Sequence, residues 1–382
     1  MNQAPELKVL SPEELQNKVC VVVGTRPGII MFSPIVTQLE QRKLNYFVLH
    51  TGQHYSYNMD RKFFEDLGLK KPQYRLETVR HCKLHGEQTA EMLKGCECVL
   101  LKEKPKIVLV GGDANTNLAG ALSARKLGIK VGHVEAGERS GDWRMPEEHN
   151  RVIIDHISEY LFTTNEKGRE NLSKDNVKGQ VFVTGNPIVD AAYRNLEIAK
   201  EKSRILEEFR LKAGSYYVLT LHREENVDIK QNLSEILEGI KLVCQKFDTR
   251  IIFLAHPRTK RRINTFGLEK ILRTIDKLDV KEPVGYLDFL ELLANAHLVL
   301  TDSGGVQQES CILKVPCVTL RDNTEWTETL RINANVLCGT NPEIIARGVE
   351  NMLKVKREWA NPFGDGKSAV RIIEAIEREL SR

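Results

Sequence analysis

The sequence contains no apolar run that approaches the roughly 18–20 residues needed to cross a membrane. It also has little excess charge, since 56 basic and 52 acidic residues leave a net charge of +4. A nucleic-acid-binding protein would show a larger and more clustered basic surplus. The first residues, MNQAPELKVLSPEELQNK, are polar and acidic, unlike a signal peptide. We therefore expect a cytoplasmic protein that binds neither membranes nor nucleic acid.

Motifs for metals and redox cofactors are missing as well. Of the eight cysteines, Cys96 and Cys98 are one residue apart on a predicted helix, which is poor spacing for zinc or a disulfide. Most other cysteines lie in apolar runs, as small core residues do. There is no Gly-x-x-x-x-Gly-Lys-Ser/Thr loop, and Gly24 and Gly28 do not complete Gly-x-Gly-x-x-Gly. The sequence predicts a reduced protein without a metal or a cofactor.

Short apolar runs alternate with helical patterns along all 382 residues, a length that suits two domains. Continuous Val, Ile and Leu runs between helices indicate parallel sheets covered on both faces. We predict an α/β fold of two Rossmann-like, doubly wound domains facing a central cleft, although one larger sheet would give much the same alternation. The predicted boundaries are 1–186, 187–362 and a C-terminal helix in 363–382 that packs back on the first domain. The predicted strands are Val19–Gly24, Tyr46–His50, Ile107–Gly111, Val131–Val134, Tyr216–Leu221, Ile251–Ala255, Leu298–Thr301 and Cys317–Leu320.

The segment Thr301–Glu309 (TDSGGVQQE) joins a predicted strand to a predicted helix. Gly304 and Gly305 would let backbone N–H groups approach an anion at the helix N-terminus, and Ser303 can add a hydroxyl. Glu309, one turn inside the helix, can accept hydrogen bonds from a ribose. An ordinary capped helix explains the local sequence equally well.

Charged residues follow the other strands. Arg26 stands after the first strand, where a guanidinium can hold a phosphate, although a solvent-facing arginine is nearly as good an explanation. Asp113 and Glu135 each follow a buried strand, where converging carboxylates suit general acid/base chemistry. Glu147 opens the helix predicted over Pro146–Tyr160, a position that acidic residues favour for structural reasons alone.

Two histidine–arginine groups follow strands of the predicted second domain. His222 precedes Arg223, and His256 is followed two residues later by Arg258. A lone histidine is usually structural, but two such groups at successive strand ends suit an anionic ligand. They do not suit zinc, because no cysteine or His-x-x-x-His spacing accompanies them.

Taken together, the motifs resemble those of the non-hydrolysing UDP-N-acetylglucosamine 2-epimerase family, which has the glycosyltransferase-B-like two-domain fold. The resemblance extends from GTRP at Gly24 to NPFGDGKS ending at Ser368. Its most specific parts are HTGQH at 50–54, HVEAG at 133–137, RMPEEHNR at 144–151, LHREEN at 221–226, AHPRT at 255–259 and DSGGVQQE at 302–309.

The resemblance implies a UDP-sugar substrate, a homodimer and no cofactor. It implies that the chain inverts carbon 2 of a UDP-linked 2-acetamido sugar through loss and re-addition of UDP. It assigns catalysis to Asp113, Glu135, Glu147 and His222, and UDP-sugar binding to Arg26, Arg151, Phe289, Ser303, Gly304, Gly305 and Glu309. Gln53, His54, Arg223 and His256 are similar to residues that hold a second, regulatory UDP-sugar in some members.

The chain departs from the family pattern at several positions. Gly28 and Met31 stand where a glutamate and a lysine are usual, Ala114 replaces a threonine, and Glu138 replaces an apolar residue. Trp326 replaces a more common arginine. In this replacement the chain is similar to the branch that epimerises UDP-2,3-diacetamido-glucuronate. The alternatives are therefore a closely related UDP-sugar substrate, a hydrolysing epimerase that releases free N-acetylmannosamine, or a non-catalytic UDP-sugar-binding protein. A glycosyltransferase is less suited, because it would not need three carboxylates in the first domain.

Overall fold

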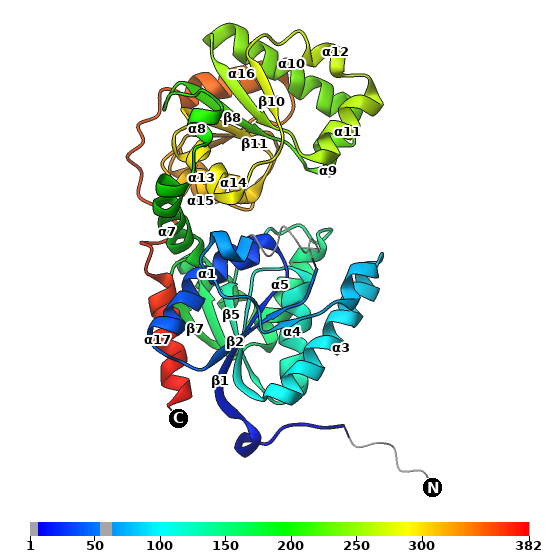
Figure 1. Ribbon diagram of the computed structural model, residues 1–382, viewed down its shortest axis with the longest axis vertical. Coiled ribbons are helices and arrows are strands. Elements are labelled where there is room, and N and C mark those ends of the chain that lie inside the picture. The colour runs from blue at the N-terminus through cyan, green and yellow to red at the C-terminus, as the bar shows by residue number, and fades with distance from the viewer. Residues whose placement is uncertain (1–6, 54–62, 382) are drawn as a thin grey trace. The chain divides into compact units, whose positions relative to one another are not determined.

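The computed structural model describes residues 7–53 and 63–381 and divides the chain into two compact units (Figure 1). Unit 1 comprises the chain up to Ala191 and again from Phe363 onward, and unit 2 comprises Ala192–Pro362. Unit 2 is thus inserted into unit 1 along the chain. In the described ranges, no helix is long and apolar enough to cross a membrane.

Unit 1 contains a parallel sheet whose described strands have the order β3-β2-β1-β4-β5-β6-β7. Consecutive parallel strands are joined through helices, as parallel pairing requires. The strands are β1 Gln16–Val23, β2 Tyr46–His50, β3 Tyr74–Arg75, β4 Pro105–Gly111, β5 Lys130–Ala136, β6 Tyr160–Thr163 and β7 Gln180–Val183. The α-helices are α1 Arg26–Gln41, α3 His85–Glu103, α4 Asn115–Lys126, α5 Pro146–Ile157, α6 Glu166–Lys174, α7 Pro187–Lys202, which leads into unit 2, and α17 Ser368–Leu380.

Unit 2 repeats this arrangement with the strand order β10-β9-β8-β11-β12-β13, again all parallel. Its strands are β8 Tyr216–Thr220, β9 Arg250–Leu254, β10 Leu278–Lys281, β11 Leu298–Thr301, β12 Cys317–Thr319 and β13 Asn335–Leu337. Its helices are α8 Ile205–Glu208, α9 Glu224–Val227, α10 Lys230–Phe247, α11 Pro257–Phe266, α12 Glu269–Leu272, α13 Tyr286–Ala294, α14 Gly304–Ile312, α15 Thr327–Arg331 and α16 Pro342–Met352.

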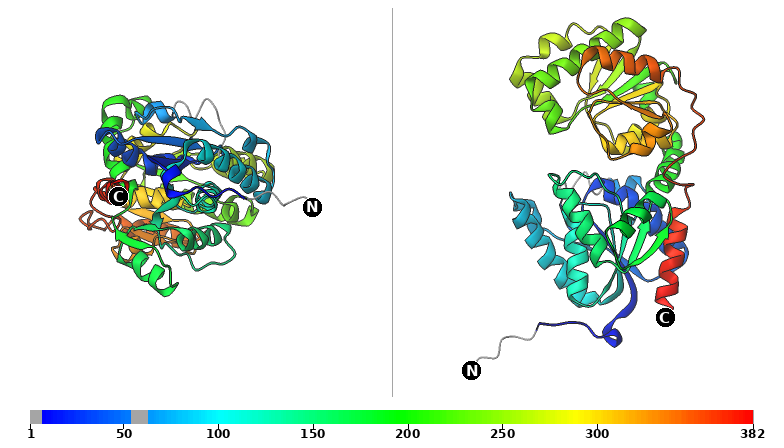
Figure 2. Two further views of the ribbon diagram at one scale, coloured as in Figure 1. Left: turned by 90° about the horizontal axis from the view of Figure 1, so that it is seen from below. Right: turned by 180° about the vertical axis from the view of Figure 1, so that it is seen from behind.

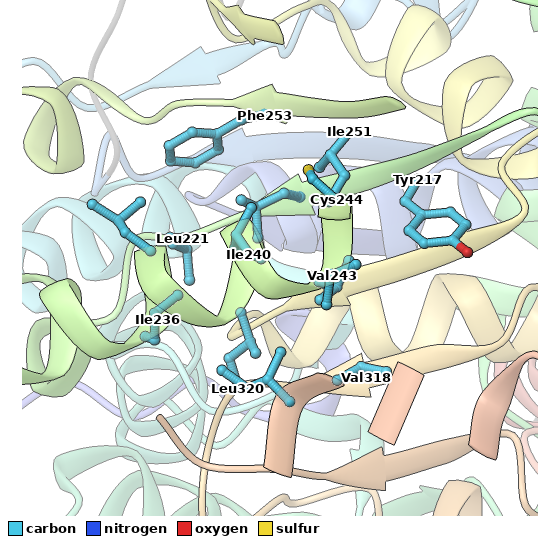
Figure 3. Close-up of a cluster of buried hydrophobic side chains, with 14 of the residues drawn as sticks. Tyr217, Leu221, Ile236, Ile240, Val243, Cys244, Ile251, Phe253, Val318 and Leu320 are labelled. Carbon is cyan, nitrogen blue, oxygen red and sulfur yellow. The ribbon is translucent and has the colours of Figure 1, made fainter. Parts of the chain in front are cut away.

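Each sheet is packed on both faces by apolar residues. In unit 2, one face of α10 contributes Ile236, Ile240 and Val243 to a buried cluster that it shares with the strands (Figure 3). The strands contribute side chains such as Phe253 and Val318 to the same cluster. Burial on both faces is the reason why the central strands have near-continuous apolar sequences. Apart from Cys96 and Cys98, five of the six other cysteines are buried and free, which confirms the prediction that most of them are core residues.

Two predicted helix boundaries were wrong. The helix predicted over Pro146–Tyr160 ends at Ile157, and Tyr160 begins strand β6. The residue pattern also predicts a helix over Pro34–Gln41, but this helix begins eight residues earlier, at Arg26, and Pro34 lies inside it.

The C-terminal helix α17 packs against α1 of unit 1 (Figure 2). Glu379 on this helix is 2% exposed and accepts hydrogen bonds from Lys130 Nζ at 2.5 Å and from the Tyr160 hydroxyl at 2.5 Å. Burial alone would raise the pKa of Glu379, but these two hydrogen bonds outweigh it and hold the pKa below its usual range. The carboxylate therefore ties α17 to strands β5 and β6.

Glu379→Ala is expected to lower the free energy of unfolding by roughly 1.5–3 kcal/mol, because a buried charge-assisted pair of hydrogen bonds is lost. Chemical denaturation measures this loss. Glu374→Ala on the same helix is the matched control, since Glu374 is 51% exposed and its nearest contact to Arg42 is 3.8 Å. That variant should change stability by no more than about 0.5 kcal/mol. Equal losses for the two variants would contradict the assignment.

Candidate functional site

The strand order of each unit reverses at one place, and ligands of doubly wound sheets bind outside the carboxyl ends of the strands at that place. In unit 1 the reversal lies between β1 and β4, and in unit 2 between β8 and β11. Asp113 follows β4 in unit 1, and Ser303 follows β11 in unit 2. The residues singled out by sequence therefore fall at the two positions that the topology favours.

Glu135 occupies an unusual backbone position at the end of β5. The pairing of β5 with β6 shifts register between Val134 and Ala136, and Glu135 has a φ of +68°. A left-handed conformation costs a non-glycine residue on the order of 1–3 kcal/mol and is concentrated at functional sites. The irregularity interrupts the alternation of the strand at Glu135, so sequence periodicity alone does not give the direction of its side chain.

The surroundings of Glu135 favour its protonated form. Burial, followed by the neighbouring carboxylates of Glu138 and Asp113, raises the pKa of Glu135 to about 8. The Arg151 guanidinium and the Asn186 amide act in the opposite direction without cancelling the effect. A carboxyl group with a pKa near neutrality can both take and return a proton, which is the requirement for general acid/base chemistry.

Asp113 is held by residues of helix α5. Its carboxylate is in direct contact with the Arg151 guanidinium, which also donates to Glu148 Oε2 at 2.8 Å. The Asn150 amide donates to the backbone carbonyl of Asp113 at 2.8 Å. The turn after β4 is thereby fixed relative to the start of α5, and Asp113, Glu135 and Arg151 form one cluster of interacting ionisable groups.

Glu147 and its neighbour Glu148 have different environments. Glu148 is 3% exposed and accepts hydrogen bonds from the backbone N–H groups of Ser140 and Gly141 and from the Ser140 hydroxyl, which fixes the preceding loop. Glu147 is exposed in the first turn of α5 and forms no hydrogen bond or ion pair with another described residue. The structure thus groups Asp113 with Glu135 but does not place Glu147 in contact with them, and the catalytic role of Glu147 stays a prediction.

The remaining predicted residues of unit 1 lie on α1 and after β2. Arg26 is the first residue of α1 and is exposed. Gln53 Oε1 accepts from the backbone N–H and the hydroxyl of Thr116, both at 2.9 Å. It thereby caps helix α4, whose N-cap residue Ala114 has no polar side chain. His54 lies outside the described residues.

Gly28 and Met31 lie one turn apart on α1. Met31 is 6% exposed, and its methyl group would lie 2.7 Å from a Cβ atom on Gly111, so it packs on the turn before Asp113. Gly28 is the third residue of the helix, after the N-cap Thr25, whose hydroxyl accepts from the Gly28 N–H. A Cβ atom on Gly28 would meet only that hydroxyl, at 3.2 Å.

Gly28→Glu is expected to raise the free energy of unfolding by about 1–2 kcal/mol. Replacing a helical glycine contributes roughly 0.5–1 kcal/mol, and a glutamate here completes a capping box with Thr25 near the positive end of the helix dipole. Denaturant melts of Gly28→Ala and Gly28→Glu separate the two contributions. The capping argument fails if glutamate is no more stabilising than alanine.

In unit 2, Asp302 organises the ends of β8 and β11. It is fully buried and accepts from the backbone N–H groups of His222 and Arg223 at 3.0 Å, from the His222 ring at 3.0 Å and from the Asn226 amide at 3.2 Å. Burial would raise the pKa of Asp302, but these donors hold it below its usual range. His222 is consequently oriented by Asp302, and its side chain is 42% exposed.

The N-terminus of α14 carries the features expected of an anion site. Ser303 is the N-cap residue, and its hydroxyl accepts from the Val306 N–H. Within the described ranges, the N–H groups of Gly304 and Gly305 have no protein acceptor. A Cβ atom on Gly304 would lie 2.1 Å from the Glu325 carboxylate, whereas one on Gly305 would meet only the Ser303 hydroxyl, at 3.9 Å. Gly304 is therefore required by packing, and Gly305 borders open space.

Glu309 lies farther along α14 and is 7% exposed. It accepts a hydrogen bond from the Tyr286 hydroxyl at 3.0 Å, and burial raises its pKa to about 7. Phe289, three residues after Tyr286 on α13, is partly buried and packs against the apolar cluster on that side of the sheet. The resemblance implies that this ring lies near uracil, and that contact stays a prediction.

His256 begins helix α11 as its N-cap residue, and its Nδ1 accepts from the Arg258 N–H at 3.2 Å. Its ring centroid is 6.1 Å from that of His222. Burial and the positive groups nearby, first His222 and then Arg258, lower the pKa of His256. Arg223 lies 3.5 Å from Glu325.

Sequence reasoning missed three residues that shape these sites. Asn150 fixes the Asp113 turn, Tyr286 binds Glu309, and Glu325 fills the space beside Gly304 while accepting from Arg321 at 2.9 Å. Asn150 lies in the RMPEEHNR motif, and Glu325 ends LRDNTE at 320–325, a segment that follows DSGGVQQE and belongs to the same resemblance. Motif membership was therefore the available signal. No pattern in the sequence pointed to Tyr286.

A profile of the UDP-N-acetylglucosamine 2-epimerase family matches residues 37–377. The UDP-N-acetylglucosamine 2-epimerase of Methanocaldococcus jannaschii is 52% identical over 362 residues, which cover 94% of this chain and 98% of that protein. The UDP-2,3-diacetamido-2,3-dideoxy-D-glucuronate 2-epimerase of Pseudomonas aeruginosa is 37% identical, with 94% and 99% covered.

A solved structure of the Methanocaldococcus jannaschii enzyme in complex with UDP-GlcNAc and UDP superposes with a TM-score of 0.86 over 94% of this chain and 99% of that one, at 52% identity. The prediction of two glycosyltransferase-B-like α/β domains is confirmed by this agreement and by the two parallel sheets. The chain belongs to the UDP-N-acetylglucosamine 2-epimerase family.

Proposed function

We propose that the protein inverts the configuration at carbon 2 of UDP-N-acetylglucosamine and yields UDP-N-acetylmannosamine. The observation that carries this proposal is the pairing of Glu135, whose pKa is about 8, with the Arg151-bound carboxylate of Asp113. Two carboxyl groups in different environments supply the acid and the base that a proton transfer in both directions requires. The names of the relatives support the same reaction.

The chemistry begins with departure of UDP. The hydrogen on carbon 2 is not adjacent to a carbonyl group, so its direct removal is unfavourable. Breaking the bond between the anomeric carbon and the diphosphate oxygen sends the electron pair to UDP and makes the carbon-2 hydrogen more acidic. A carboxylate then takes that proton and leaves a glycal with a double bond between carbons 1 and 2. Protonation of carbon 2 on the opposite face and re-addition of UDP complete the epimerisation, and no redox cofactor takes part.

Binding of UDP is assigned mainly to residues of unit 2. Donors that point at the developing negative charge of a leaving group stabilise it most effectively. The N–H groups of Gly304 and Gly305 and the Ser303 hydroxyl are such donors. The His222 ring, which Asp302 holds in place, is assigned as a further donor. Glu309, fixed by Tyr286, is suited to accept hydrogen bonds from the ribose. Arg26 and Phe289 are assigned to phosphate and uracil.

Electrostatics favours a neutral sugar over a uronate. A uronate carboxylate needs a cation, but Met31 is an apolar side chain on the turn before Asp113. Glu138, which raises the pKa of Glu135, adds a further negative group to the same cluster. We therefore assign UDP-N-acetylglucosamine as the preferred substrate, ahead of the UDP-diacetamido-uronate suggested by Trp326.

The test is proton NMR of the purified protein with UDP-N-acetylglucosamine in deuterated water. We expect deuterium at carbon 2 and the anomeric signal of UDP-N-acetylmannosamine. Accumulation of UDP with free N-acetylmannosamine would instead identify a hydrolysing enzyme. Binding of UDP without exchange would identify a non-catalytic binding protein, and exchange confined to a UDP-diacetamido-uronate would overturn the substrate assignment.

We further propose that the protein acts as a cytoplasmic homodimer and supplies an activated sugar for polysaccharide biosynthesis. Exposed apolar side chains in unit 1, namely Leu84, Trp143 and Ile153, support association of copies through this unit. Light scattering at micromolar concentration should give twice the mass of one chain, and the mass of a single chain would refute the dimer.

The predicted regulatory site, formed by Gln53, His54, Arg223 and His256, is also a proposal. Gln53 and Arg223 already contact Thr116 and Glu325, so a ligand there would compete with these contacts. Cooperative dependence of the rate on UDP-N-acetylglucosamine is expected if the site operates, whereas a hyperbolic dependence would argue against it.

A further inference from the structure

A buried histidine–aspartate pair in unit 1 contacts the backbone next to Asp113 and Glu135. His133 on β5 and Asp155 on α5 are both 0% exposed, and His133 Nδ1 is 2.7 Å from Asp155 Oδ1. His133 is flanked in the sheet by Val110 and Leu161, which are apolar. None of the chemistry described above uses this pair.

The second ring nitrogen of His133 and the second carboxylate oxygen of Asp155 contact backbone groups close in sequence to Asp113 and Glu135. His133 Nε2 lies 3.1 Å from the carbonyl oxygen of Gly112, the residue before Asp113. Asp155 Oδ2 accepts from the backbone N–H of Gly137 at 3.2 Å, two residues after Glu135. Asp155 is also on the same helix as Arg151. The pair therefore connects the turn after β4, the end of β5 and helix α5.

The hydrogen-bond geometry favours an imidazole that carries a proton on both ring nitrogens. Both ring nitrogens face acceptors, and a neutral imidazole has only one N–H group. A neutral ring would leave a lone pair pointing at a buried oxygen, which is costly. A protonated Asp155 is disfavoured, because its Oδ2 already accepts from Gly137 and lies 2.7 Å from the Arg139 guanidinium. Arg139 also pairs with Asp175 at 2.9 Å, so the charges of the group balance when His133 is a cation.

We propose that His133 is a positioning residue that, as a buried imidazolium paired with Asp155, holds the Gly112 carbonyl and thereby the backbone that carries Asp113 and Glu135. This inference rests on the proposed function for its kinetic consequence, whereas the state of the ring can be tested without any substrate. His133 does not contact the reacting atoms. Its effect is to keep the two carboxyl groups at a fixed separation.

The first experiment is nitrogen-15 NMR of the histidine side chains of the full-length protein at pH 7–8. We expect the His133 ring to carry a proton on both nitrogens, with the resonance assigned by its absence from His133→Asn. Asp155→Asn should convert the ring to a neutral form. A wild-type His133 with a single N–H at neutral pH would overturn the proposal, whether or not the variants fold.

The second experiment compares the kinetics of His133→Asn and Asp155→Asn with wild type. A displacement of reacting groups by about 1 Å costs on the order of 100-fold in rate, so we expect kcat to fall by about that factor. UDP affinity should be largely retained, because most of the predicted UDP-binding residues lie in unit 2. His156→Asn is the matched control on α5, since His156 is exposed and its ring contacts the Val152 carbonyl. Unchanged kcat in folded His133→Asn would overturn the positioning role, whereas a wild type without carbon-2 exchange would refute the proposed function alone.

Discussion

Replacing Glu135 by glutamine is expected to reduce exchange of the carbon-2 hydrogen of UDP-N-acetylglucosamine by roughly 100- to 10,000-fold. Glutamine has nearly the same size as glutamate and should tolerate the left-handed backbone as well as glutamate does, but it can neither take nor return a proton. UDP binding should persist, because the predicted UDP-binding set lies mainly in unit 2. Deuterium incorporation followed by NMR measures the exchange, and the shift in melting temperature with UDP measures the binding.

The other carboxylates provide the comparison. Asp113→Asn should also suppress exchange, and the notable case is Glu147, which is exposed and makes no contact with the described part of the cluster. If Glu147→Gln retains normal exchange while Glu135→Gln and Asp113→Asn lose it, catalysis needs only Glu135 and Asp113, which interact electrostatically. Near-normal exchange in all three variants would refute the catalytic assignment. Glu148→Gln is not a suitable control, since Glu148 fixes the loop before α5.

The raised pKa of Glu135 also predicts the pH dependence of stability. The folded protein holds the proton up to about pH 8, whereas the unfolded chain loses it near the ordinary glutamate pKa of 4.5. The contribution of this group to stability is therefore complete below about pH 4.5 and is lost as the pH rises through 8. Glu135→Gln should show a smaller loss of stability between pH 5 and 8 than wild type. Identical slopes would mean that Glu135 is ionised in the folded state.

Asp302→Ala is expected to lower the free energy of unfolding by about 3–5 kcal/mol, the usual cost of removing one partner from a buried charged network. The backbone N–H groups of His222 and Arg223 would lose their acceptor, and the Asn226 amide would keep only the Leu320 carbonyl. Affinity for UDP should fall as well, because His222 and the adjoining Ser303 lose their support. Urea denaturation and calorimetric titration with UDP measure the two effects.

Asp276→Ala is the matched control in the same unit. Asp276 is exposed and forms no hydrogen bond or ion pair with another described residue, so the change should stay within about 0.5 kcal/mol.

The stability contributed by Asp302 depends on pH with the opposite sign to that contributed by Glu135. Because the pKa of Asp302 is depressed, its stabilisation is present above the unfolded value of 3.8 and is lost as the pH falls through the folded value. A mild effect of Asp302→Ala would show that the network is dispensable.

Much of the fold was predictable, because the central strands are buried on both faces and have continuous apolar sequences. The edge and peripheral strands were not, since β3 has two residues and β13 three, too few to produce a periodic pattern. The error at Tyr160 has a similar cause. Ile154, Ile157 and Tyr160 continue a helical spacing, so the apolar pattern gives no sign that the helix ends before β6.

Some features of the candidate site could likewise be predicted from the sequence, and others could not. Asp113 and Glu135 were recognisable because each follows a buried strand, and strand ends of parallel sheets gather at one edge. The left-handed backbone of Glu135 could not be predicted, because it depends on the register between β5 and β6. The capping of α4 by Gln53 was equally hidden, since it joins residues 63 positions apart.

The insertion of unit 2 between the two parts of unit 1 has a consequence for the order of synthesis. Strands β1 to β7 leave the ribosome first, but α17, which packs on α1 and is tied to Tyr160 through Glu379, is translated only after all of unit 2. At roughly 5–20 residues per second, the delay is on the order of ten seconds or more. During that time the face of unit 1 that α17 covers is exposed in the nascent chain, while unit 2 is continuous and can fold first. Folding of unit 1 should therefore depend on chaperones more than folding of unit 2 does. Moving residues 363–382 ahead of Leu7 by circular permutation should reduce this dependence.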